Sequence, residues 1–98
     1  MEILSIEDIL LYLRNNKRFF YEDFGVTRMG IFGSFTRGQQ TLSSDIDMVI
    51  EIEPKNIHSF MKFKRFLEKE LSSKIDMGFE HSLKPIIKDK IKGQIIYV

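Results

Sequence analysis

The chain has no cysteine and no tryptophan, and it has only two prolines among its 98 residues. Without thiols, disulfide frameworks, thiolate zinc sites and cysteine nucleophiles are excluded together. No apolar run approaches the roughly 20 residues that a membrane-spanning helix needs. Acidic residues, Glu2 and Glu7, stand where a signal peptide carries basic ones. We therefore expect a cytoplasmic protein.

The charges are nearly balanced. Lysine and arginine number 15 against 14 aspartate and glutamate, for a net charge of +1. This balance argues against a strongly basic nucleic-acid module, although it leaves a local basic patch open. Hydrophobic residues make up 43% of the chain, enough for a core in one domain over residues 1–98. A domain of this size hides only about 60% of its unfolded surface, so a cleft closed on both sides would need a second protein.

Hydrophobic periodicity predicts alternating helices and strands in the order α-β-β-α-β-α-β. This order is typical of an α/β or α+β fold, with a mixed central sheet of about four strands flanked by helices. The expected helices span residues 6–15, 57–73 and 83–92, the last with Ser82 as its N-cap, and the expected strands span 28–32, 46–52, 74–79 and 94–98.

The segment Phe19–Gly25 is rich in aromatic residues. We interpret it as a connection that packs the end of the first helix against the sheet, with Gly25 turning the chain. A further turn of helix is one alternative, and an aromatic docking surface is another.

A Gly-Ser step, Gly33-Ser34, follows the first expected strand, and Arg37 lies three residues further on. Glycine lets backbone amides approach an anion closely, and the serine hydroxyl adds a donor beside them. The step therefore indicates a phosphate-binding turn. Arg37 either contacts a phosphate group or forms an ion pair that orients the loop.

Three aspartates complete the pattern. Asp45 and Asp47 are two residues apart at the start of a strand, so they share a face, with Cα atoms about 6.5–7 Å apart. Asp76 lies in the third expected strand and meets them if that strand neighbours the second. Such carboxylates are hard oxygen ligands suited to Mg²⁺, and three of them can hold two ions for in-line attack on a nucleotide phosphorus.

The sequence resembles the minimal nucleotidyltransferase domain of the DNA polymerase β-like superfamily. The features that carry the resemblance are the string from Ile31 to Gly38, the ten residues between Ser34 and Asp45, the Asp45-x-Asp47 pair and the later strand aspartate. The similarity covers most of the chain, and the MntA-like antitoxins, whose partners are HEPN-domain ribonuclease toxins, are the most similar branch. One departure is Gly78, where a bulkier strand residue is usual.

The resemblance implies a function and a role for each motif residue. The activity would be transfer of AMP from ATP to a hydroxyl of the HEPN toxin, typically a tyrosine, with release of pyrophosphate. Gly33 and Ser34 would hold the triphosphate, with Arg37 as a further phosphate contact. Asp45 and Asp47 would bind both Mg²⁺ ions, and Asp76 would bind one of them and take the acceptor's proton. The target protein would supply the missing wall of the acceptor site.

Two other functions remain open at this stage. One is an antitoxin that binds nucleotide but neutralises its partner by occlusion alone. The other is the nucleotide half of a transferase that acts on a small hydroxyl compound such as an aminoglycoside. His58 and His81 have no partner at ligand spacing, and we interpret them as surface or core residues. Lys84, Lys88 and Lys92 recur every four residues on a helix face that is interpreted as solvated, with a partner or RNA surface as the alternative.

Overall fold

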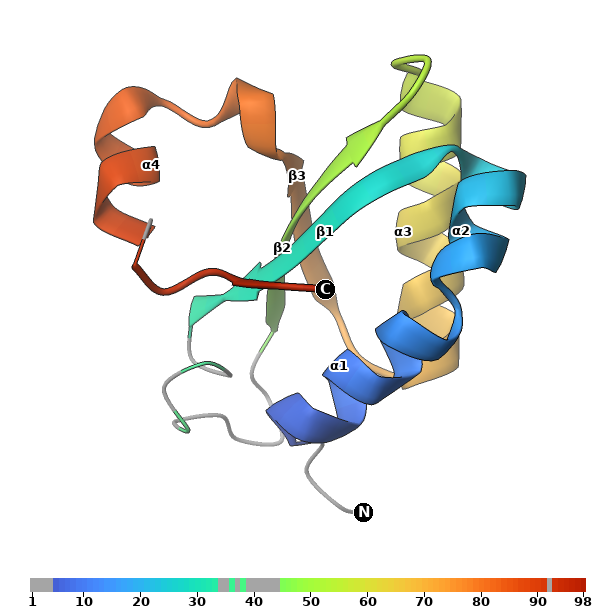
Figure 1. The fold of residues 1–98 in the computed structure, drawn as a ribbon, viewed down its shortest axis with the longest axis horizontal. Helices are drawn as coiled ribbons and strands as arrows, with labels where there is room; N and C mark the ends of the chain where they lie inside the picture. The colour runs from blue at the N-terminus through green and yellow to red at the C-terminus, as the bar shows by residue number, and fades with distance from the viewer. Residues whose placement is uncertain (1–4, 34–35, 37, 39–44, 92) are drawn as a thin grey trace.

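The computed structural model describes residues 5–33, 36, 38, 45–91 and 93–98. Its helices lie on both sides of one four-stranded sheet (Figure 1). The elements in chain order are α1 (Ile6–Asn15), α2 (Lys17–Phe24), β1 (Val26–Phe32), β2 (Ile46–Ile52), α3 (Ile57–Leu71), β3 (Ile75–Phe79), the 3₁₀ turn η2 (Glu80–Ser82), α4 (Pro85–Ile91) and β4 (Ile96–Tyr97).

The sheet has the strand order β3-β2-β1-β4. β1 runs antiparallel to both β2 and β4, whereas β2 and β3 are parallel. The mixed sheet of four strands flanked by helices confirms the expected fold class. The second and third strands are neighbours, which is the condition under which Asp76 can meet Asp47.

The core lies between one face of the sheet and helices α1, α2 and α3. Alternate residues of the strands point into it, because successive side chains of a strand face opposite sides. Those from β2 are Ile46, Met48, Ile50 and Ile52. The residues between them, which include Asp47 and Glu51, therefore face the other side of the sheet, where Figure 1 shows α4 standing apart from the other helices.

The segment after the first helix is a helix of its own, so the interpretation of Phe19–Gly25 as a connection was wrong. Tertiary packing explains the helix: Phe20 is fully buried, and its ring centroid lies 4.9 Å from that of Phe63 on α3. Phe24 packs against Phe63 as well, at 5.3 Å. Gly25 does turn the chain, with φ of 76° at the C-cap of α2.

The C-terminal elements also differ from the expectation. Ser82 belongs to η2 and Leu83 is extended, so α4 begins at Pro85 rather than at Leu83. Proline is well suited to the first turn of a helix because it lacks an N–H to satisfy there. The last strand is limited to Ile96–Tyr97.

Within the part of the chain that the structure describes, no helix is both long and apolar enough to cross a membrane.

Candidate functional site

Two of the predicted acidic residues meet on neighbouring strands. In the parallel register, Asp47 of β2 pairs with Asp76 of β3, and adjacent strands lie about 4.8 Å apart. Asp45 comes directly before β2, separated from Asp47 by the fully buried Ile46. Asp47 and Asp76 thus lie side by side on the sheet face opposite the core, and Asp45 comes just before them at the start of β2.

The Gly33 turn is in contact with this acidic group. Gly33 follows Phe32, which pairs with Asp47 across the antiparallel ladder. Its φ of 81° is left-handed, and its carbonyl accepts hydrogen bonds from the backbone N–H of Thr36 at 3.1 Å and the hydroxyl of Thr36 at 2.7 Å. A Cβ at Gly33 would collide with Oδ2 of Asp47 and lie 3.0 Å from its Cγ. Only glycine lets the turn and the carboxylate approach so closely.

Substitution of Gly33 by alanine is expected to destabilise the fold. The left-handed backbone costs an L-residue about 1–2 kcal/mol, and the overlap with Asp47 adds to that cost. We expect the free energy of unfolding in urea to fall by about 2 kcal/mol or more. Gly93→Ala is the control, because a Cβ at Gly93 would meet nothing within 4 Å and its φ is not positive. Equal stability of the two variants would contradict the close contact.

The other two predicted phosphate ligands, Ser34 and Arg37, lie outside the described residues, so their roles stay predictions.

The donor set suits Mg²⁺ chemically, because Asp45, Asp47 and Asp76 offer only carboxylate oxygens. Asp45 and Asp47 are half-buried and Asp76 is exposed. Among residues 5–33, 36, 38, 45–91 and 93–98, no three histidine, cysteine or acidic side chains are gathered closely enough to form a finished metal site. The strand register therefore brings Asp47 and Asp76 together. The described residues do not place a third ligand close enough to complete a metal site.

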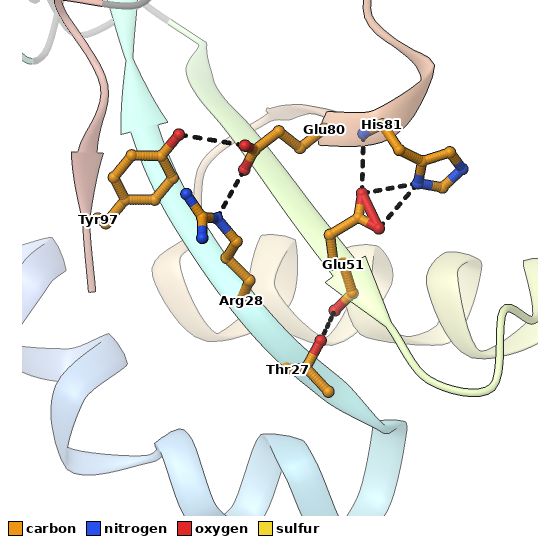
Figure 2. A network of polar contacts seen from close by, with 6 residues as sticks. All are labelled: Thr27, Arg28, Glu51, Glu80, His81 and Tyr97. Atoms are coloured by element: carbon orange, nitrogen blue, oxygen red, sulfur yellow. Dashed lines mark hydrogen bonds and ion pairs between the residues drawn. The ribbon is translucent and has the colours of Figure 1, made fainter.

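A second polar cluster occupies the same face further along the strands (Figure 2). Arg28 of β1 forms an ion pair with Glu80 at 2.9 Å, and the hydroxyl of Tyr97 donates to the other oxygen of Glu80 at 3.2 Å. The guanidinium of Arg28 lies 4.2 Å from the centroid of the Tyr97 ring, a cation–π distance. These contacts join β1, η2 and β4.

Glu51 and His81 form the other half of the cluster. Glu51 accepts hydrogen bonds from the backbone N–H of His81 at 2.8 Å, and its two oxygens lie 2.7 and 2.8 Å from Nδ1 of the imidazole. His81 is thus a partner of a carboxylate, which its isolated position in the sequence did not reveal. The contact spans 30 residues and arises only because β2 and η2 meet.

The Glu51–His81 pair predicts that the stability of the fold depends on pH. Burial raises the pKa of Glu51, but the hydrogen bonds and charge of His81 outweigh burial and bring that pKa below its ordinary value. A lowered pKa in the folded state contributes stability above the unfolded pKa of about 4.3. This contribution is lost as the pH falls through the folded pKa.

Unfolding of the unaltered protein and of Glu51→Gln at pH 7 and at pH 3 tests this dependence. The unaltered protein should lose more stability between the two pH values, by up to about 1 kcal/mol for a pair this close to solvent. A larger loss in the variant would reverse the sign and contradict the assignment.

The fold is that of a nucleotidyltransferase domain. The sequence matches the nucleotidyltransferase domain family over residues 13–98, so the chain belongs to this family. It is 31% identical to the protein adenylyltransferase MntA of Thermococcus cleftensis over 99 residues, which cover 100% of both chains. The resemblance to MntA-like minimal nucleotidyltransferases is therefore confirmed, as is the expected enzyme class.

The solved structures that share the fold include two that bear on the site. One, assigned provisionally as a minimal nucleotidyltransferase, has a TM-score of 0.79 at 22% identity and covers 98% of each chain. The other is a toxin–antitoxin with AMP-PNP, with a TM-score of 0.68 at 20% identity, and the match covers 85% of this chain and 69% of that one.

Proposed function

We propose that this chain transfers AMP from ATP to a tyrosine hydroxyl of a partner HEPN toxin and thereby acts as an antitoxin. The observation that carries the proposal is the contact of the Gly33 turn with Asp47, which lies in register with Asp76. The family match and the protein adenylyltransferase MntA as a relative over the full length support the same activity. The toxin–antitoxin structure with AMP-PNP supports a toxin as partner and an adenine nucleotide as ligand. Because ATP is the donor, the cytoplasm is the compartment we propose.

Each predicted residue has a role in this proposal. Gly33, Ser34 and Arg37 hold the triphosphate, since glycine gives the backbone amides close access to it. Asp45, Asp47 and Asp76 would hold two Mg²⁺ ions. When bound there, Mg²⁺ neutralises phosphate charge and makes the acceptor hydroxyl easier to deprotonate.

The transfer is an in-line substitution at the α-phosphorus. The tyrosine oxygen forms a bond to this phosphorus, while the bond to the oxygen that bridges to the β-phosphate breaks. The electron pair of that bond leaves with pyrophosphate. The proton of the tyrosine hydroxyl passes to the carboxylate of Asp76, the most exposed of the three acids.

The test uses ATP labelled at either the α- or the γ-phosphate, with Mg²⁺, this chain and a purified HEPN toxin. Adenylyl transfer predicts that the α-label becomes attached to the toxin and that the γ-label leaves as pyrophosphate. Attachment of the γ-label would indicate phosphoryl transfer instead. No label on the toxin, with the chain folded and binding AMP-PNP, would contradict the catalytic proposal and leave neutralisation by binding.

A further inference from the structure

Gly78 leaves an opening in the face of the sheet beside Asp76. It lies two residues beyond Asp76 on β3, and a Cβ at this position would meet nothing within 4 Å. Gly30, which lies on the other side of Val49 in the ladders, is different: a Cβ there would lie 2.6 Å from the side chain of Ile95 and 3.1 Å from the ring of Tyr97. Of these two glycines, only Gly78 is uncovered.

The direction from which the acceptor must attack the α-phosphorus leads to the opening at Gly78. Gly33 follows the end of β1, beyond the level of Asp47, and β1 runs antiparallel to β2 and β3. A triphosphate held at Gly33 places the leaving pyrophosphate on that side of the acidic group. In-line attack requires the acceptor oxygen to approach from the opposite side. On β3, the opposite side is the direction from Asp76 to Gly78, a step of about 6.6 Å.

A hollow lies further along the same direction. It measures about 240 Å³ and is lined by Arg28, Glu51, Glu80, His81 and Lys88. Arg28 is paired with Glu80 and His81 with Glu51 (Figure 2). Lys88 reaches the hollow from α4 and forms no ion pair with any residue in the described ranges. It is thus the cation that remains available to an incoming carboxylate.

We propose that the acceptor tyrosine lies over Gly78 with its hydroxyl at Asp76, and that a neighbouring acidic residue of the acceptor protein pairs with Lys88. This placement rests on the proposed function. The distance from Asp76 to Gly78 matches the reach of a tyrosine side chain better than that of serine or threonine, whose hydroxyls lie close to the backbone. The absence of a side chain at Gly78 leaves room for the flat ring.

Gly78→Val tests the placement without removing a proposed ligand. Gly78 does not have a positive φ, and valine favours strands, so this variant is expected to fold. We expect it to bind Mg²⁺ and AMP-PNP as the unaltered chain does, but to transfer AMP to a purified HEPN toxin about a hundredfold more slowly, because the acceptor is displaced. Gly93→Val, in open surroundings elsewhere, should leave transfer unchanged.

The outcomes separate the two proposals. Normal transfer by Gly78→Val, or loss of AMP-PNP binding in this variant, would overturn the acceptor placement. Absence of transfer by the unaltered chain would overturn the proposed function and the placement with it.

Lys88→Gln tests the second contact. We expect it to raise the KM for the toxin about tenfold, the cost of one ion pair that bridges two proteins, with kcat unchanged. Lys90→Gln is the matched control, because Lys90 lies on the same short helix and does not line the hollow. Equal KM values for the two variants would remove Lys88 from the acceptor site.

Discussion

Asp47→Asn is expected to reduce transfer of AMP to the toxin at least a thousandfold while the protein stays folded. Asparagine keeps the shape of the side chain against the Gly33 turn, but it removes the charge that a Mg²⁺ ion requires. Metal ions supply several kcal/mol of charge stabilisation in such transition states, and each 1.36 kcal/mol corresponds to a factor of ten in rate. The rate of label transfer from α-labelled ATP measures the loss, and thermal unfolding reports whether the fold is intact.

Asp23→Asn is the control for this variant. Asp23 is an exposed acid on α2, a helix that packs on the core side of the sheet. The same substitution there should leave the rate unchanged. If Asp47→Asn retained more than a tenth of the activity, Asp47 would not be a metal ligand in the reaction.

Phe63→Ala is expected to produce the largest loss of stability. Phe63 on α3 is fully buried and lies 4.9 Å from Phe20 and 5.3 Å from Phe24, measured between ring centroids. Its removal leaves a cavity between α3 and α2, and such truncations cost about 3–5 kcal/mol. A small domain has about 5–15 kcal/mol in total, so the variant should lose a large share of its free energy of unfolding.

Urea unfolding followed by circular dichroism measures this loss. Phe19→Ala is the matched control, because Phe19 is 37% exposed on the same helix as Phe20. Phe19 contacts the rings of Phe20, Phe24 and Phe66. Because Phe19 is partly exposed, its removal should still cost about 2 kcal/mol, less than that of Phe63. Equal losses in both variants would mean that the cluster between α2 and α3 does not organise the core.

The meeting of Asp47 and Asp76 follows from features that the sequence shows in part. The spacing of Asp45 and Asp47 places both beside the buried Ile46. Asp76 was expected to meet them on the condition that the third strand neighbours the second, and the parallel pairing of β2 with β3 fulfils that condition. The contact between Gly33 and the Asp47 carboxylate was not predictable, because it depends on the register of β1 against β2. A one-residue shift of that register would turn the side chains to the other face.

The helix α2 shows where local reasoning failed. Phe20 and Phe24 are four residues apart, which is a helical spacing. The same segment is also consistent with a short aromatic connection between the first helix and the sheet. Packing against Phe63 decides between these structures, and that partner lies about forty residues further along the sequence. The ion pair of Arg28 with Glu80, across 52 residues, was beyond sequence reasoning for the same reason.

The central claim is that the Gly33 turn, Asp47 and Asp76 form one site for a metal-bound nucleotide. Paramagnetic Mn²⁺ with AMP-PNP tests it directly, because the ion broadens NMR signals of nearby amides. We expect selective broadening at Gly33, Asp47 and Asp76, with little effect on α2, and loss of the broadening in Asp47→Asn. Broadening centred on Glu51, Glu80 and His81 instead, or none that depends on nucleotide, would contradict the account.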